Sequence, residues 1–330
     1  MAKSIEKKCV KLWNIIRRLR KHIESIRRSH KAKVAFFQLT GSTLPLPGKT
    51  RWNSHFLMIN VFLKFAAHVK AVYLNHFPRR KYTVTDSDLS TLQEFAELTK
   101  VFQSAILRLQ LDSVTSSKCY GIFRELLDAT SDNFIDPVMN DLAKSMKEEL
   151  LRRFGKYIDV EDAAFDPHFI LCCLMDPHEA VCLSEVAPFK LSQIIKQRLP
   201  TGLDEVHEIV PNDATTSTLT FRDRMALNVT QKNGNLQNDE DSRIIKFVKE
   251  MLSGDHQNFK AADYWKNVSF EFKFLQHLAF SILAIPASSA PSEKVFSQCA
   301  IATKGLKNRT KEELLNNKLM VHLNLNKLLL

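Results

Sequence analysis

Glycine is scarce in this sequence, with 8 residues among 330. Because glycine is the usual residue of tight turns, its scarcity argues against a turn-rich β architecture and favours long helices. Long apolar runs are also missing, since no stretch approaches the ~20 apolar residues of a membrane-spanning helix. Apolar residues nevertheless make up 45% of the chain, enough to bury a substantial core. The composition therefore predicts a mostly all-α protein with no membrane partner.

Cysteine pairs and metal-ligand motifs are missing as well. The six cysteines are scattered with no CxxC pair and no secretory signal, which indicates a reducing intracellular compartment. An Asp-Pro-His sequence occurs at 166–168 and again at 176–178, but ten residues along a helix span ~15 Å, too far for one metal ion. Aspartate followed by proline instead suits the start of a helix. We expect no metal site, no cofactor and no small-molecule substrate.

Acidic residues are nearly absent from the first fifty positions. Residues 1–50 hold thirteen Lys and Arg against two Glu, an excess equal to the net charge of +11 of the whole chain. A basic excess confined to one segment is typical of contact with the phosphate backbone of DNA, although a solvated helix face or a mitochondrial presequence are alternatives. The candidate DNA contacts of this segment are Arg17, Arg18, Arg20 and Lys21.

Apolar residues recur at helical spacing along most of the first two hundred residues. This periodicity predicts one or two helices over 4–39, a helix from residue 53, and further helices over 86–110, 118–130 and 135–154. From 200 to 241 polar residues dominate, and too little apolar surface is available for folding. The predicted organisation is a helical domain with basic N-terminal helices at 1–200, a polar flexible linker at 201–241 and a C-terminal region at 242–330.

An Arg-Trp pair precedes the helix predicted from Asn53. The guanidinium of Arg51 could hold a phosphate while the indole of Trp52 stacks on a base. The alternative is a tryptophan buried at the entry of a helix. Arg51 and Trp52 join the candidate DNA contacts.

The last fifth of the chain holds its most specific pattern. Tyr264-Trp265 is followed by an apolar run to Ile285, by Pro-Ala-Ser-Ser-Ala-Pro-Ser-Glu-Lys-Val-Phe-Ser at 286–297, and by a leucine-rich helix ending near Asn324. The serines and proline predict a helix start that places Glu293 in the first turns, where the helix dipole stabilises a carboxylate. The apolar stripe of the last helix lies either in the chain's own core or against a partner.

This pattern resembles the C-terminal dimerisation region of hAT transposases. The basic helices, the Thr-Arg-Trp-Asn-Ser sequence at 50–54 and the Leu-Met-Asp-Pro sequence at 174–177 extend the resemblance over nearly the whole chain, toward relatives of the BED-finger type. The resemblance implies a helical insertion domain followed by the C-terminal helices of a split RNase H-like fold, with the central β-sheet largely missing. It also implies a dimer, and we expect its interface to include Trp265, Phe296, Leu315, Leu319 and Leu323.

Glu293 matches the catalytic glutamate of that family, whose two catalytic aspartates have no counterpart in this sequence. Two-metal phosphoryl transfer needs carboxylates from separate elements on ions ~4 Å apart, so one glutamate cannot supply the site. We expect a nuclear, transposase-derived protein that forms a homodimer or higher oligomer, binds DNA and is not an enzyme alone. The alternatives are a fragment of an active transposase, which would use Mg²⁺ or Mn²⁺, and a relic without function.

Overall fold

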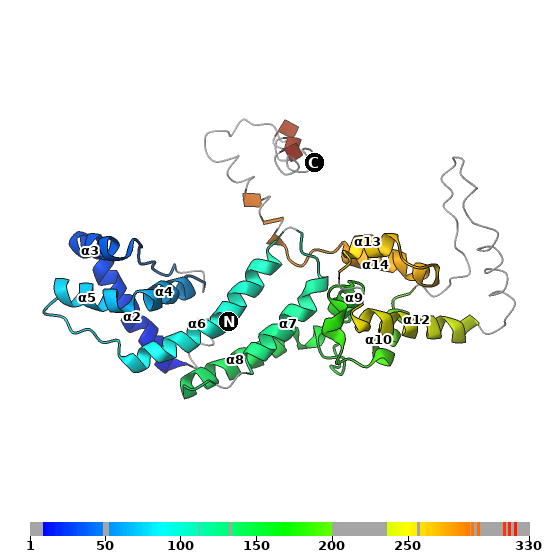
Figure 1. The fold of residues 1–330 in the computed structure, drawn as a ribbon, viewed down its shortest axis with the longest axis horizontal. Coiled ribbons are helices and arrows are strands. Elements are labelled where there is room, and N and C mark those ends of the chain that lie inside the picture. Colours follow the sequence, from blue (N-terminus) through cyan, green and yellow to red (C-terminus); the bar gives the residue numbers. More distant parts are fainter. Residues whose placement is uncertain are drawn as a thin grey trace. The chain divides into compact units, whose positions relative to one another are not determined.

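The computed structural model describes residues 9–48, 53–111, 113–131, 134–199, 236–255 and 258–290, together with five residue pairs between 292 and 321. Within these ranges the chain forms α-helices and short 3-10 helices (Figure 1), and its only β feature is an isolated bridge between Thr115 and Pro286. The prediction of a mostly all-α fold is confirmed. Among the described residues no single helix is long and apolar enough to cross a membrane.

The chain forms two compact units, each containing segments that are far apart in the sequence. The first unit holds residues 1–112, 122–165 and 289–330, and the second holds 113–121 and 166–288. We call them the outer unit and the inner unit by their order in the sequence alone, since segments of the first flank those of the second. This division departs from the predicted boundary at residue 200, because residues 166–199 pack with the helices that follow residue 236. Periodicity in one segment cannot reveal such a long-range pairing.

The outer unit begins with two helices separated at Ser29. Helix α2 spans Val10–Arg28 and α3 spans His30–Thr40, and the Ser29 hydroxyl accepts a hydrogen bond from the Ala32 N–H at 3.3 Å. This capping contact explains why the helix predicted over 4–39 is divided. The apolar stripe of α2 is buried at Leu12, Ile16, Leu19 and Ile23, and Cys9 just before the helix is buried as well. The basic residues of α2 other than the partly buried Arg18 therefore lie on the solvent-facing side.

The next helices of the outer unit supply most of its core. They are α4 (Asn53–Lys64), α5 (Ala66–His76), α6 (Asp86–Leu109), α7 (Ser117–Ala129), α8 (Pro137–Phe154) and the 3-10 helix η1 (Gly155–Tyr157). Together α4 and α5 are apolar enough to resemble a bent membrane span. Their apolar side chains, including Met58, Ile59, Phe62 and Val69, are instead fully buried in the unit. Helix α3 packs on α5 and α4 packs on α6.

Helix α7 crosses the boundary between the two units, since its first five residues belong to the inner unit. The other elements of the inner unit are α9 (His168–Leu174), η2 (Ala180–Leu183), α10 (Pro188–Lys196), α12 (Leu236–Ser253), α13 (Ala261–Lys266), η3 (Phe270–Leu275) and α14 (Gln276–Leu283). Helix α12 begins inside the segment predicted as a linker and packs on α10. Its buried residues Ile244, Phe247, Val248 and Met251 supply the apolar face for this contact.

The apolar run of α9 forms the centre of the inner unit. Ile170 to Met175 are all buried, and the Asp166 carboxylate accepts a hydrogen bond from the His168 N–H at 3.1 Å. Asp176 accepts one from the His178 N–H at 3.2 Å in the same way. Each aspartate thus closes an Asx turn with the residue two positions on. The predicted N-cap role is wrong, because the N-caps of α9 and η2 are Pro167 and Glu179 and no side chain caps them.

Candidate functional site

The four basic residues predicted on α2 differ in their surroundings. Arg17, Arg20 and Lys21 are exposed, whereas Arg18 is partly buried. Arg17 donates to the side chain of Asn14 at 3.0 Å, and Arg20 forms an ion pair with Glu24 at 2.8 Å. Such exposed contacts are weak and can exchange for a phosphate at little cost. Three of the four residues are therefore available to a ligand.

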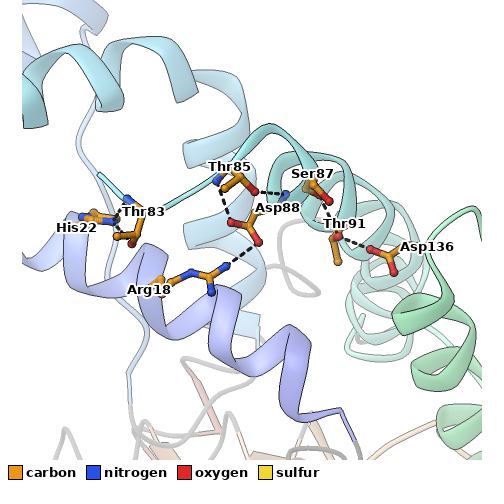
Figure 2. Close-up of polar contacts among 8 residues, drawn as sticks. All are labelled: Arg18, His22, Thr83, Thr85, Ser87, Asp88, Thr91 and Asp136. Carbon is orange, nitrogen blue, oxygen red and sulfur yellow. Dashed lines mark hydrogen bonds and ion pairs between the residues drawn. The ribbon is translucent and has the colours of Figure 1, made fainter. Parts of the chain in front are cut away.

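Arg18 is held in a network that joins α2 to the start of α6 (Figure 2). Its Nη2 lies 2.7 Å from Oδ1 of Asp88, whose side chain is only 10% exposed. The other oxygen of Asp88 accepts from the Thr85 N–H at 2.8 Å, while the Thr85 hydroxyl accepts from the Asp88 N–H at 3.2 Å. This reciprocal capping box fixes the carboxylate that binds Arg18. Arg18 therefore contributes to the assembly of the unit.

The network continues from α6 to α8 (Figure 2). The Thr91 hydroxyl donates to the Ser87 carbonyl at 3.1 Å and also contacts the Asp136 carboxylate. Asp136 is the N-cap of α8 and accepts from the Val138 N–H at 2.8 Å. Asp88 thus connects the basic helix α2 to α6, and Asp136 connects α6 to α8.

A pocket of about 500 Å³ opens beside this network, between α2 and the connection from α5 to α6. Its basic residues are Arg18, Lys21, Arg28 and Arg80. Arg80 was not among the predicted DNA contacts, because it lies outside residues 1–50 and only its proximity to α2 in the fold singles it out. Arg80 donates to the hydroxyl of Ser25 at 3.3 Å.

His22 forms a wall of the same pocket and is only 5% exposed. Its ring stacks on Tyr82, with ring centroids 4.8 Å apart, and meets Tyr73 edge-on at 4.4 Å. The Thr83 N–H donates to Nε2 at 3.2 Å, which places the proton of the neutral ring on Nδ1. Burial, with Arg18 nearby, lowers the pKa of His22 below its usual 6.5. The ring is therefore neutral and rigidly held at neutral pH.

A second, smaller pocket of about 290 Å³ lies at the beginning of α2. Arg17, Arg20 and Asn14 line it together with Trp13 and His55, whose rings meet edge-on at a centroid distance of 5.4 Å. The predicted pair Arg51 and Trp52 lies outside the described residues. Polar and aromatic groups therefore gather on α2 beside the residues predicted to contact DNA.

Glu293 lies in the first turns of a helical segment that begins at Ala290, as the sequence predicts. The carboxylate is exposed and accepts a hydrogen bond from the Ser289 hydroxyl at 3.1 Å. The part of the chain that the structure describes holds no group of three or more His, Cys, Asp or Glu side chains suited to a metal ion. The geometry around Glu293 is that of a helix start.

The residues predicted for self-association fall into different environments. Trp265 is fully buried in the inner unit, where its Nε1 donates to the Met175 carbonyl at 2.6 Å and its ring lies 5.6 Å from that of Phe247. Phe296 is 71% exposed. Leu315, Leu319 and Leu323 lie outside the described residues. Their neighbours Leu314, Met320 and Val321 are each about half exposed.

Thiol chemistry is a feature of the inner unit that sequence analysis did not single out. Cys182 is exposed, and a hydrogen bond from the buried Cys173 thiol lowers its pKa to about 7. The Glu179 carbonyl oxygen lies 3.2 Å from the Cys173 sulfur and is an alternative acceptor for its single S–H. Burial raises the pKa of Cys119 to about 11 and that of Cys172 to about 12. Among the described cysteines Cys182 is distinguished by its exposure and by its pairing with Cys173, and neither can be read from the sequence.

Residues 243–326 match the hAT family C-terminal dimerisation region. The match runs from α12 through α13 and α14 to the segment that holds Glu293 and Phe296. No curated protein matches the chain. The family match supports a relationship to hAT transposases and self-association of the chain.

Proposed function

We propose that this protein is a transposase-derived nuclear protein that self-associates through residues 264–325 and binds DNA through the basic face of α2. The observation that carries the proposal is the match of residues 243–326 to the hAT dimerisation region. We also propose that the chain descends from a BED-finger-type relative. The helices of the matched region would then correspond to the C-terminal end of a split RNase H-like fold.

Exposed apolar side chains within the matched region support self-association. Phe296 is 71% exposed in the outer unit, and Leu314 and Val321 are 49% and 54% exposed. In the inner unit Phe270 and Phe280 are also exposed. Large apolar side chains that a monomer leaves in water are typical of an interface between subunits. Because the matched family region is a dimerisation region, the proposed partner at this interface is a second copy of this chain.

Light scattering on the full chain tests this association. We expect an oligomer that dissociates when Phe296 is replaced by Asp, because the charge would be buried at the interface. Phe189→Asp is the matched control, since Phe189 is 63% exposed but lies outside the matched region. A wild-type chain that remains monomeric at tens of micromolar contradicts the proposal. So does an oligomer that is equally sensitive to both substitutions.

Support for DNA binding comes from the charge and exposure of α2. Arg17, Arg20 and Lys21 are exposed on a helix that lies within the basic segment 1–50. Simultaneous replacement of these three residues by Gln should weaken binding to duplex DNA and reduce its dependence on salt. Arg18 is kept in this test because it pairs with Asp88. Unchanged affinity and salt dependence would show that the basic face is merely solvated.

We further propose that the chain alone does not cut DNA. Metal-dependent cleavage needs several carboxylates around the ions, and within the described residues Glu293 belongs to no such group. We expect no nicking or joining of DNA by the full chain with Mg²⁺ or Mn²⁺. Nicking that Glu293→Gln abolishes would instead favour the alternative function, that of part of an active transposase.

A further inference from the structure

We infer that the pocket between α2 and the α5–α6 connection is a phosphate-binding site that seats one backbone phosphate of DNA. This inference rests on the proposed DNA binding and adds a defined site to it. The pocket occupies about 500 Å³ and brings Lys21, Arg28 and Arg80 together from two segments of the chain. Arg80, which lies outside the basic segment 1–50, is therefore one of the residues that contact the phosphate.

The charges that line the pocket do not cancel. Its single carboxylate, that of Glu24, is paired with Arg20 at 2.8 Å, and Arg18 is paired with Asp88 at 2.7 Å. Lys21, Arg28 and Arg80 form no ion pair with any carboxylate in the described ranges. Three positive charges in a concave surface raise the local potential and attract an anion. The pocket is therefore selective for negative charge.

The orientation of Arg80 suits a phosphate. Its guanidinium lies over the ring of Phe77, 5.4 Å from the centroid, and Nη1 donates to the Ser25 hydroxyl at 3.3 Å. These two contacts hold the plane of the guanidinium and leave further N–H groups to donate. A guanidinium held in this way binds two phosphate oxygens at once. The Thr83 hydroxyl at the pocket wall lies 2.9 Å from the unprotonated Nε2 of His22 and donates to it, so it holds the ring in place.

His22 gives the pocket a rigid wall whose state can be measured. The neutral ring is fixed by Tyr73, Tyr82 and Thr83, and the nearby charge of Arg18 contributes to its lowered pKa. An anion seated among these cations would offset that charge. The pKa of His22 should therefore rise when the pocket is occupied. If the positive surface attracts DNA only from a distance and no phosphate enters the pocket, the pKa of His22 should not change.

Fluorescence anisotropy with a labelled DNA duplex tests the site. We expect Arg80→Gln to weaken binding roughly tenfold, and to reduce the slope of log affinity against log salt by about one. Arg80→Lys should restore part of the affinity because it keeps the charge. The matched control is Arg79→Gln, since Arg79 is the exposed neighbour of Arg80 and does not line the pocket. Equal effects of Arg79→Gln and Arg80→Gln would overturn the site while leaving DNA binding intact.

A second measurement separates this inference from the proposed function. NMR spectra of the full chain are recorded with inorganic phosphate, following the His22 ring and the Thr83 amide. We expect both to shift and the His22 pKa to rise, with both effects lost in Arg80→Gln. Should the chain not bind DNA but still show these shifts, the phosphate site stands and its phosphate comes from another ligand. Absence of any shift, together with equal DNA binding by both arginine variants, refutes the site.

Discussion

At the scale of single residues, neighbouring basic side chains on α2 have different roles. Arg18 and Lys21 are one turn apart, yet Arg18 is paired with a nearly buried aspartate and Lys21 faces a pocket. The difference arises from Asp88, which is fixed by the capping box of α6. Counting charges along the sequence cannot separate the two residues, because the partner of Arg18 is 70 positions away.

The Asp88 carboxylate should matter more for stability than its neighbour Asp86. Asp88→Ala removes half of the capping box and leaves Arg18 without its partner, so the free energy of unfolding should fall by about 1–2 kcal/mol. Urea unfolding followed by circular dichroism measures the change. The control is Asp86→Ala, which alters an exposed carboxylate of the same helical turn. Equal losses in the two variants would contradict the proposed importance of the network.

The Cys182 thiol should be the most reactive of the thiols whose pKa values are shifted. With a pKa of about 7, it is about half ionised at neutral pH, whereas Cys119 and Cys172 remain protonated. Its alkylation by iodoacetamide should accelerate as the pH rises through 7 and then level off. Mass spectrometry of the labelled peptides gives each rate.

The substitution Cys173→Ala provides the internal control for this reactivity. It removes the hydrogen bond that is the main cause of the lowered pKa, so the midpoint for Cys182 should move to higher pH. An unchanged midpoint would mean that Lys118 and His178, which also lower this pKa, are sufficient by themselves.

At the scale of elements, the sequence predicts most helices of the outer unit to within a few residues. The helix predicted over 86–110 spans Asp86–Leu109, and the one predicted over 135–154 spans Pro137–Phe154. Local capping and apolar spacing determine these bounds, so they can be predicted. The packing of α10 on α12 cannot be predicted in this way, because the two helices are separated by about forty residues of sequence. For the same reason the pocket residue Arg80 could not be predicted.

Trp265 in α13 lies in the matched dimerisation region and is fully buried within the chain. Trp265→Phe should lower the free energy of unfolding by about 2–3 kcal/mol, because the Met175 carbonyl loses its donor and a cavity forms. The oligomeric state of the folded protein should not change. Denaturant unfolding and light scattering on the same variant measure both properties. Dissociation without loss of stability would place the indole at the interface instead.

At the scale of the whole molecule, neither unit is a continuous stretch of chain. Residues 113–121 belong to the inner unit, where the Ser116 N–H donates to the Ile285 carbonyl at 2.9 Å and the Ser117 hydroxyl donates to Asp176 at 2.7 Å. The sequence suggested domains in simple succession, and these hydrogen bonds explain why that division does not describe the fold. Asp176, the aspartate of the second Asp-Pro-His sequence, therefore helps to join residues 113–121 to the rest of the inner unit.

Removal of residues 241–330 should therefore disrupt more than self-association. The deletion takes away most of α12 with α13 and α14, and so exposes the apolar side chains of α9 and α10 that they cover. We expect hydrogen exchange to increase at 166–199 while α2 to α6 remain protected. Full protection of 166–199 in the shortened chain would contradict this dependence. Point variants such as Phe296→Asp are for this reason the better test of association.

The bridge between Thr115 and Pro286 also has a consequence for protein synthesis. The ribosome releases residues 113–121 long before it makes residues 285–287, so the earlier segment has to wait for its hydrogen-bonding partners. Contacts between such distant positions form slowly, since the intervening chain must first be brought together. Meanwhile the buried side chains of α9 lack the cover of α14. Chaperones that bind apolar segments should therefore bind α9 of the nascent chain after α9 is synthesised and before α14 is synthesised.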